Sequence, residues 1–487
     1  MSHRLDFATS ANKKYEATWE DLDARPLPEW YDRAKIGIFV HWGVYSVPGF
    51  YSEWFWYVWM GLLSSQITFS DQGIKDFLEN NYRPGFTYQE FAPMFAAEFF
   101  DPNYWANMFQ YSGAKYVILT SKHHDGYTLF PSNQTYSWNS VDIGPHRDIV
   151  AELGEAVRKR GMEYGLYYSL LEWFNPMYMQ DLLSASPSYV YVDKKMLPEL
   201  KSLVTMYKPS VLWVDGEWEC EADYWKSKEI LAWLYNESPV KDHVVVNDRW
   251  GARLRCVHGD FYNCDDRFNP GSLQEHKWEN AFSLDINSWG YRRNMDLSHV
   301  LTSKELIMTV IKTVSCGGNA LINVGPTKEG IIPLIFQERL KDLGDWLRIN
   351  GEAIYDTSPW LYQNDTFLGD VWYTCTKMGF NARKPTAVPS VLDKITAIYA
   401  IFGCWPVNNI LNLRQITSQI QNRPYQVEML GEYGKLNWKI IDGEFTVRLP
   451  NKAAVSTTHA WTLKFTPSEL VNDTDTSVND VNDKLNF

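Results

Sequence analysis

Residues 210–215 read SVLWVD, an apolar run that is almost unbroken until it ends in a carboxylate. Apolar character at nearly every position, rather than at alternate ones, is typical of a parallel strand that is buried on both faces. Similar runs, rich in β-branched and aromatic residues, recur along the chain, so the sequence predicts a set of buried parallel strands. The runs are KIGIFVH (35–41), KYVILTSKHH (115–124), EYGLYYS (163–169), HVVVND (243–248) and NALINV (319–324).

Amphipathic stretches separate these runs. The clearest covers residues 145–160, where Ile149, Val150, Leu153 and Val157 form one apolar stripe with helical spacing. Its acidic residues come early and its basic residues late, an order that suits the helix dipole. Strands and helices that alternate over about 320 residues predict a (β/α)8-like barrel or a doubly wound sheet. Further helices are predicted at 196–207, 222–235, 303–314 and 332–349.

Several of the predicted strands end in polar or ionisable side chains, which helps to distinguish the two folds. Barrel enzymes collect their functional groups at the carboxyl ends of the strands. A doubly wound sheet concentrates them at one switch point, usually beside a glycine fingerprint, and no GxGxxG follows the first strand here. We therefore predict an α/β fold of the (β/α)8-like, TIM-type barrel class. The strand-end residues are His41, His123, His124, Ser169 leading to Glu172, Asp215, Asp248 and Arg249.

The sequence changes character after residue 351. Alternating apolar and polar segments with polar turns between them are typical of antiparallel strands, and we predict these at 371–376, 395–402, 436–441, 444–449 and 457–465. The predicted organisation is a barrel domain at 1–351, a C-terminal antiparallel β-sandwich domain at 352–467, and a polar, disordered tail at 468–487.

Charge and composition exclude several classes of partner. The net charge of −13 would repel nucleic acid and anionic membranes, and no run approaches the roughly 18 apolar residues of a membrane helix. The first ten residues, MSHRLDFATS, lack the apolar region of an export signal. The six cysteines include no CxxC pair, so structural zinc is not expected. Cys256 and Cys264 flank one short loop and either bridge or stay free thiols.

Asp215 is the first candidate for chemistry. A carboxylate at the end of a buried strand is unfavourable unless something uses or satisfies it, and a helix cap or an arginine partner is the alternative to a catalytic role. The polar groups at the other strand ends favour catalysis. Retaining glycosidases pair an ionised nucleophile with a second carboxyl about 5–5.5 Å away, and Arg249 is placed to keep Asp215 ionised.

The other rim residues suit a sugar. Imidazoles can donate to and accept from hydroxyl groups, which is the role that we predict for the three strand-end histidines. Aromatic rings pack against the apolar face of a sugar ring, although burial in the core is the alternative for each of them. The candidates for this second role are Trp54, Trp56 and Trp289.

Seven strings, in order along the chain, carry a family resemblance. They are WYDRAKIGIFVHWGVYSVPGFYSEWFW, KYVILTSKHHDGYTLFPS, YGLYYSLLEWFNP, LWVDGEWE, VVVNDRWG, HKWE and SWGYRR. Together they resemble the α-L-fucosidases of glycoside hydrolase family 29, and their pattern is most similar to the animal tissue (lysosomal) and plasma enzymes. The resemblance implies a (β/α)8-like barrel with a C-terminal β-sandwich, a lysosomal or secreted location, and hydrolysis of terminal α-linked L-fucose with retention. It implies no metal and no organic cofactor.

The resemblance also implies roles for residues. Asp215 falls on the nucleophile, and Trp289 falls on an aromatic residue of the pocket. The sugar-binding positions fall on His41, Glu53, His123, His124, Tyr167 and Arg249.

The acid/base falls on one of two carboxyls, Asp266 in NCDDRF or Glu279 in HKWE. Asp266 lies closer to the nucleophile in sequence. Glu279 stands beside Trp278, an apolar neighbour that would raise the pKa of a carboxyl group. For either residue the alternative is a surface salt bridge, to Arg267 or to Lys277 respectively.

Two other functions stay open. His41, His123, His124 and Asp125 suggest a metal-dependent barrel hydrolase, although neighbouring histidines on a strand point in different directions and no HxH or HxxxH spacing occurs. A catalytically inactive, fucose-binding barrel is the second alternative. The expected partner is a fucosylated glycan, with no nucleic acid and no membrane, and a homo-oligomer is an open option.

Overall fold

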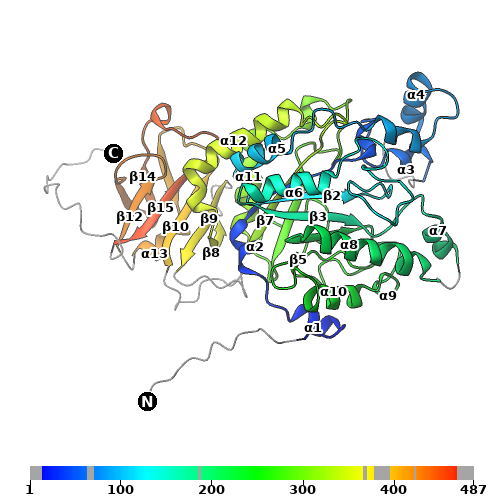
Figure 1. Cartoon of the computed structure of the whole chain (residues 1–487). Coiled ribbons are helices and arrows are strands. Elements are labelled where there is room, and N and C mark those ends of the chain that lie inside the picture. The colour runs from blue at the N-terminus through cyan, green and yellow to red at the C-terminus, as the bar shows by residue number, and fades with distance from the viewer. Residues whose placement is uncertain are drawn as a thin grey trace, which may run out of the picture.

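A seven-stranded parallel sheet forms the framework of the larger part of the molecule (Figure 1). The computed structural model describes residues 14–62, 71–184, 188–365, 370–377, 395–421 and 424–468. Neighbouring strands of the sheet follow the order β5-β4-β3-β2-β1-β7-β6. Their bounds are β1 Ile36–Val40, β2 Tyr116–Lys122, β3 Glu163–Ser169, β4 Val211–Asp215, β5 Val245–Val246, β6 Trp278–Ser283 and β7 Gly318–Val324.

A short stretch between the two edge strands closes the sheet into a barrel. The backbone N–H of Phe261 donates to the carbonyl of Val246 in β5 (3.2 Å), and the N–H of Tyr262 donates to the carbonyl of Lys277 at the start of β6 (2.9 Å). Residues 261–262 therefore stand where an eighth strand would lie. The predicted (β/α)8-like barrel is confirmed. The strand predicted at 243–248 is shorter in the structure, where β5 covers Val245–Val246 because the chain leaves the sheet after Val246.

The barrel strands are buried on both faces, as their continuous apolar character predicts. In β2, Tyr116 and Ile118 point into the barrel, whereas Val117 and Leu119 point outward to the helices. Trp213 of β4 belongs to the same interior cluster. Successive side chains of a strand alternate between faces, so every second residue of each strand fills the barrel or lines its mouth.

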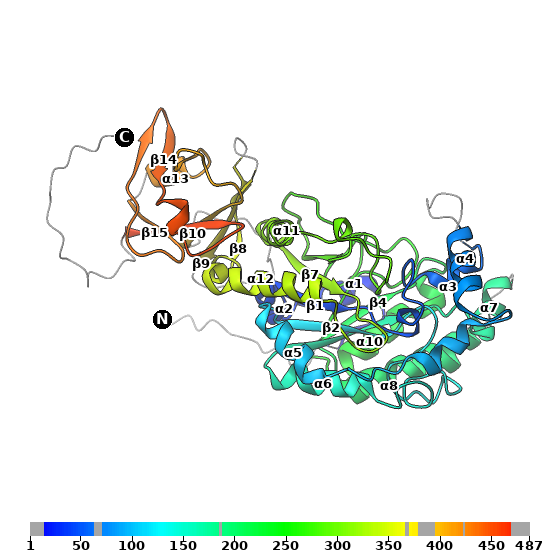
Figure 2. The ribbon, with the colours of Figure 1, turned by 90° about the horizontal axis from the view of Figure 1, so that it is seen from above.

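Helices pack around the barrel, as the amphipathic stretches predict (Figure 2). Asp148 caps α6 by accepting from the N–H of Ala151, and the apolar stripe of this helix is buried. The helix predicted at 222–235 is divided at Lys226, whose φ of 51° ends α9 before α10 begins. In the described part of the chain, no helix is long and apolar enough to cross a membrane. The helices are α1 Trp19–Asp23, α2 Glu29–Ala34, α3 Phe55–Trp59, α4 Asp71–Asn81, α5 Pro102–Tyr111, α6 Ile149–Lys159, α7 Pro176–Leu183, α8 Leu197–Tyr207, α9 Ala222–Trp225, α10 Ser227–Asn236, α11 Ser303–Ser315 and α12 Leu334–Asn350.

Sequence analysis did not predict strand β6. Its sequence, WENAFS, is too polar to read as a buried strand, yet all six residues are buried. On the outer face the Asn280 amide nitrogen donates to the hydroxyl of Thr313 (3.1 Å), while the Glu279 side chain on the inner face is held by barrel residues from elsewhere in the chain. Both side chains can be buried in this strand because each makes at least one hydrogen bond.

The C-terminal region is built from two antiparallel sheets that share one apolar core. The β-sandwich prediction is confirmed, and the boundary at 351/352 stays our proposal; residues 378–394 and the predicted tail from 469 lie outside the described residues. Figure 2 shows α11 and α12 beside these sheets, and Trp346 of α12 donates to the carbonyl of Ala460 (2.9 Å). The elements are β8 Ser358–Asn364, β9 Val371–Lys377, β10 Ile395–Phe402, β11 Ile410–Leu413, α13 Thr417–Gln421, β12 Tyr425–Met429, β13 Trp438–Ile441, β14 Glu444–Arg448 and β15 Trp461–Pro467.

Candidate active site

A small pocket opens at the carboxyl ends of the barrel strands, with a volume of about 80 Å³. This volume is well below the roughly 300–1,000 Å³ of clefts that enclose larger ligands. The pocket therefore suits the terminal unit of a longer ligand. With the exception of Glu279, it brings together every residue that sequence analysis assigned to catalysis or to sugar binding through the family resemblance. Its lining is Phe39, His41, Glu53, Trp54, His123, His124, Tyr167, Trp213, Asp215, Trp218, Arg249, Arg255, Asp266 and Trp289.

Asp215 ends strand β4 and receives a donor on each carboxylate oxygen. Arg249 Nη1 donates to Oδ1 (2.9 Å) and the Tyr167 hydroxyl donates to Oδ2 (2.9 Å). His124 Nε2 lies 3.7 Å from Oδ2. Burial alone would raise the pKa of Asp215, but the charge and hydrogen bond of Arg249, the charge of Arg255 and the hydrogen bond of Tyr167 together outweigh burial, and the pKa lies below its ordinary value. The side chain is therefore an anion at neutral pH and 12% exposed, which suits a nucleophile.

Asp266 accepts a hydrogen bond from the same arginine as Asp215. Arg249 Nη2 donates to Asp266 Oδ1 at 2.6 Å, so one guanidinium bonds both acidic side chains and they cannot lie far apart. The side chain of Asp266 is 48% exposed, in contrast to that of Asp215. It extends from the loop that follows residues 261–262, and a carboxyl there can meet both a leaving group and water.

Glu279 lies in the barrel interior and does not line the pocket. The residue is 0% exposed, and its carboxylate accepts from Tyr31 (2.7 Å), Tyr116 (2.7 Å), Trp213 (3.0 Å) and Asn263 (3.2 Å). Burial raises its pKa, and the hydroxyl, indole and amide donors partly offset this. Of the two acid/base candidates, only Asp266 reaches the pocket.

The three histidines of the rim are buried and neutral. Burial lowers the pKa of His41 to about 4, and it lowers the pKa values of His123 and His124 well below their ordinary value. His41 Nδ1 lies 2.7 Å from Asn323 Oδ1, and His124 Nδ1 lies 2.7 Å from Ser169 Oγ. These contacts occupy Nδ1, so each of the two neutral rings keeps Nε2 to donate to or accept from a ligand hydroxyl.

Glu53 is fixed at the mouth of the pocket by backbone donors. Its Oε2 accepts from the N–H groups of Trp289 (3.1 Å) and Gly290 (2.9 Å), and it is buried. Trp54 and Trp289 line the pocket as predicted. Trp56 does not line the pocket; its partly buried ring stacks on Trp173 (centroids 5.5 Å apart) and packs against the core.

Sequence reasoning missed four lining residues. Trp213 lies two positions before Asp215 on β4 and shares its face, so the alternation of a strand could have predicted it. Trp218 stands in the string LWVDGEWE. Phe39 lies two positions before His41, so the same alternation could have predicted it. For Arg255, no signal in the sequence marks a place in the pocket.

The residues of the metal alternative are engaged in other contacts. Asp125 accepts from the Tyr88 hydroxyl (2.9 Å) and the N–H of Tyr127 (3.0 Å). Among the described residues, the one grouping of three metal-ligand side chains is Asp248 with Cys256 and Cys264. These two cysteines form a disulfide, so neither is available as the thiolate that would bind a metal.

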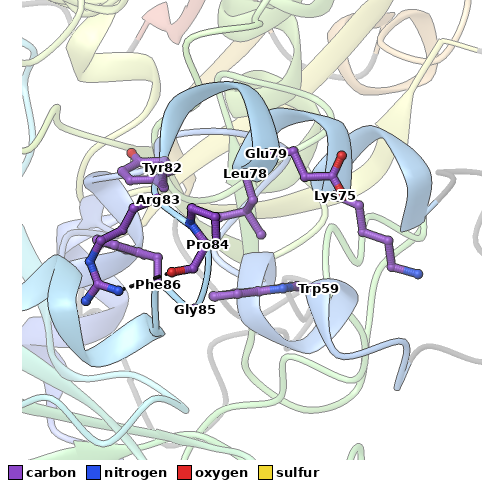
Figure 3. Close-up of a pocket in the computed structure, with 9 residues that line it drawn as sticks. All are labelled: Trp59, Lys75, Leu78, Glu79, Tyr82, Arg83, Pro84, Gly85 and Phe86. Carbon is purple, nitrogen blue, oxygen red and sulfur yellow. Dashed lines mark hydrogen bonds between the residues drawn. The ribbon is translucent and has the colours of Figure 1, made fainter.

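A larger hollow, of about 550 Å³, lies beside α3 and α4 (Figure 3). Among the described residues that line it, Glu79 is the one carboxylate, and it is exposed to solvent. The described lining includes no second acidic group, and a pair of carboxyls is what glycoside hydrolysis requires. The smaller pocket at the strand ends is therefore the candidate active site. The hollow is lined by Trp59, Lys75, Leu78, Glu79, Tyr82, Arg83, Pro84, Gly85 and Phe86.

Comparisons with known proteins match both regions of the chain. The family model for α-L-fucosidase matches residues 5–352, and the model for the α-L-fucosidase C-terminal domain matches residues 363–466. Tissue α-L-fucosidase from Homo sapiens is 49% identical over 457 residues, which cover 93% of this chain and 92% of that protein. Plasma α-L-fucosidase from Rattus norvegicus is 51% identical over 425 residues, covering 87% of each chain.

Solved structures give the same similarity at the level of the fold. The crystal structure of the Thermotoga maritima α-fucosidase in complex with fucose superposes with a TM-score of 0.73 at 32% sequence identity. The superposition covers 93% of this chain and 100% of that one. It therefore includes both the barrel and the C-terminal sheets.

Proposed function

The chain belongs to the α-L-fucosidase family of glycoside hydrolases, and on that premise we propose that it releases terminal α-linked L-fucose from glycans with retention of configuration. Asp215 is the nucleophile and Asp266 is the acid/base. The observation that carries these roles is the double contact of Arg249, which bonds both carboxylates at the mouth of one pocket. Fucosylated glycans are the substrate class.

In the first step, an Asp215 oxygen attacks the anomeric carbon of fucose while the bond to the leaving oxygen breaks. Asp266 gives its proton to that oxygen, so the aglycone departs as a neutral alcohol. The positive charge of Arg249 keeps Asp215 ionised for this attack. The product is a fucosyl-enzyme joined through an ester to Asp215.

In the second step, Asp266 acts in the opposite sense. As a carboxylate it removes a proton from water, whose oxygen attacks the same carbon from the face that the aglycone left. The ester bond breaks and Asp215 leaves as an anion. Two inversions at one carbon return fucose with its original configuration.

The pocket lining supports recognition of a deoxy-sugar. Neutral His41, His123 and His124 can bond hydroxyl groups, whereas Phe39 and Trp289 supply apolar surface. Fucose carries a methyl group where galactose carries a hydroxymethyl group. A galactose hydroxyl against an apolar wall would have no partner, which gives a modest preference for fucose.

The roles of the two carboxylates are tested with Asp215→Gly and Asp266→Gly on aryl α-L-fucosides. Both variants are expected to lose turnover by orders of magnitude on substrates with poor leaving groups. Azide should restore each variant with opposite stereochemistry, giving β-fucosyl azide for Asp215→Gly and α-fucosyl azide for Asp266→Gly. Wild-type protein that does not turn over a chromogenic fucoside would favour the inactive, fucose-binding alternative. An Asp215→Gly variant with normal turnover would refute the assignment of the nucleophile.

We also propose that the protein acts in a lysosomal or secreted setting. Support comes from its similarity to the tissue and plasma α-L-fucosidases and from the disulfide between Cys256 and Cys264, since disulfides persist in oxidising compartments. Immunolocalisation in the source cells tests the compartment, and a cytosolic signal would refute it. Assembly into a homo-oligomer stays a prediction, which light scattering on the purified protein tests.

A further inference from the structure

Glu279 is a buried carboxylate that the proposed reaction does not use. Its four donors come from four separate parts of the barrel, and two of them, the Trp213 indole N–H and the Asn263 amide, can only donate. Both of these reach Oε1, while the hydroxyls of Tyr31 and Tyr116 reach Oε2. The carboxylate is fully hydrogen-bonded, but every partner is neutral. Burial of an ionised group among neutral partners costs free energy. This raises the question of which part of the structure the carboxylate positions.

Trp213 connects Glu279 to the catalytic pair. Its Nε1–H points to Glu279, and its ring contacts both groups that bond the nucleophile. The Arg249 guanidinium carbon lies 4.7 Å from the Trp213 ring centroid. The Tyr167 ring is stacked on the same indole at 5.6 Å, with an interplanar angle of 23°. Both donors to Asp215 therefore rest on one aromatic ring.

The orientation of Arg249 depends on its contact with the Trp213 ring. Its Nη1 and Nη2 bond Asp215 and Asp266, but its buried Nε has no hydrogen-bond partner among the described residues. The plane of the guanidinium is thus set by two carboxylates and by the indole face. A cation over an aromatic face is attracted by the ring quadrupole, so a tilt of Trp213 would move Arg249 and both carboxylates with it.

We propose that Glu279 is a positioning residue for the catalytic pair: it anchors the Trp213 indole, on which Arg249 and Tyr167 are aligned against Asp215. This inference rests on the proposed roles of Asp215 and Asp266. Glu279 neither lines the pocket nor meets solvent, so it acts through its four hydrogen-bond partners, of which Trp213 is the one that lines the pocket.

Two substitutions of similar size separate anchoring from proton transfer. Glu279→Gln keeps an acceptor for Trp213 and Asn263, while the two tyrosine hydroxyls can turn to accept from its amide. Glu279→Met fills the same space without an acceptor and leaves the indole N–H unpaired. We expect kcat of the Gln variant to stay within about threefold of wild type and kcat of the Met variant to fall about tenfold or more, because a small misplacement of reacting groups is costly.

The pH profile of kcat/KM supplies a readout that a merely structural role would not move. Asp215 must be ionised, and poorer alignment of Arg249 and Tyr167 would raise its pKa. The acid limb of the Met variant should therefore move to higher pH, whereas that of the Gln variant should stay in place. Besides Arg249 and Tyr167, the ionisable groups around Asp215 are His41, His123, His124, Glu217, Arg255 and Asp266, and neither substitution touches them.

Tyr31→Phe is the matched control, because it removes a donor from the opposite oxygen of Glu279 without touching Trp213. It should lower the melting temperature but leave kcat and the acid limb unchanged. If Glu279→Met fails to fold, Trp213→Phe takes its place, since it keeps an aromatic ring but lacks the N–H. The same loss of kcat and the same shift of the acid limb are expected.

Two results would overturn the proposal in different ways. A Gln variant as inactive as the Met variant on poor leaving groups, with turnover restored by azide, would make Glu279 the acid/base and refute the role of Asp266 as well. Met and Tyr31→Phe variants that lose only thermal stability, with kcat per folded molecule and acid limbs unchanged, would leave Glu279 a structural group. In that case the roles of Asp215 and Asp266 would stand.

Discussion

Arg249 donates from Nη1 to the Asp215 carboxylate at 2.9 Å, across the ends of neighbouring strands β4 and β5. The contact is buried, with side-chain exposures of 3% and 12%. An ion pair in such surroundings is sensitive to the loss of either member, because the remaining charge is left without its partner. The pair thus favours the ionised form of Asp215, the proposed nucleophile.

Arg249→Gln is expected to raise the pKa of Asp215 and to move the acid limb of kcat/KM to higher pH. The sign follows from the native pair, which holds the pKa of this carboxyl below its ordinary value. Turnover should fall by about a hundredfold or more, as for removal of a preorganised electrostatic partner. Arg249→Lys keeps the charge but not the planar fork, so its acid limb should shift less. An unchanged limb in the Gln variant would contradict this account.

Tyr167→Phe removes the second donor to Asp215 while it keeps the ring that packs on Trp213. A loss in kcat of about tenfold is expected, since one hydrogen bond to a charged group is lost. Tyr168→Phe is the matched control, because the neighbouring hydroxyl points outward to Glu199 (2.9 Å). Steady-state kinetics and thermal unfolding of both variants check this. Equal effects of the two changes on kcat per folded molecule would refute it.

The buried histidines predict a protein that loses stability on acidification. Their pKa values in the folded state lie below the ordinary value of 6.5, to about 4 for His41. The unfolded chain therefore binds more protons as the pH falls below about 6.5, and the free energy of unfolding decreases by about 1.4 kcal/mol per pH unit for each such histidine. Denaturant unfolding between pH 7 and pH 5 measures this slope. His123→Asn should reduce the slope by about one proton, and an identical slope would count against a neutral, buried imidazole there.

Gly216 follows the nucleophile and cannot be replaced without strain. Its φ is +77°, and an added Cβ would lie 2.9 Å from Leu171 Cγ and 3.0 Å from Ser169 Oγ. Gly216→Ala is expected to destabilise the protein by about 1–3 kcal/mol, as is typical of a strained backbone position, and to lower kcat because Asp215 moves. Gly161→Ala shares the positive φ (+73°) but meets nothing within 4 Å, so it should lose stability with kcat unchanged. Thermal unfolding and kinetics of both variants provide the comparison.

Much of the fold could be predicted because the barrel strands leave a strong local pattern. SVLWVD is apolar throughout since helices cover one face and the barrel interior the other, and the predicted strand at 163–169 matches β3 residue for residue. Strand β6 left no such pattern. Glu279 is satisfied by Tyr31, 248 positions away along the chain, and no local rule anticipates a partner so distant.

The candidate site could be predicted where residues stand at the ends of strands. Asp215 and Arg249 follow directly from that rule, because the topology alone brings strand ends to one rim. The choice between Asp266 and Glu279 could not be made in this way. It depends on which face of β6 carries Glu279 and on the path of the loop after Tyr262, and both are settled only when the barrel closes.

The two carboxyl groups of the proposed catalytic pair are attached to the fold in different ways. Asp215 is part of the barrel wall, whereas Asp266 is carried by a loop that is tied down by the Cys256–Cys264 bridge and by Asp248, which accepts from the backbone N–H of both cysteines. If the bridge were reduced, the loop that carries Asp266 would be held less firmly. We expect this to slow the deprotonation of water by Asp266 more than the attack of Asp215 on an activated fucoside. Fucose would then stay bound to Asp215 as an ester. Treatment with a mild reductant is therefore expected to trap the fucosyl-enzyme halfway through the catalytic cycle.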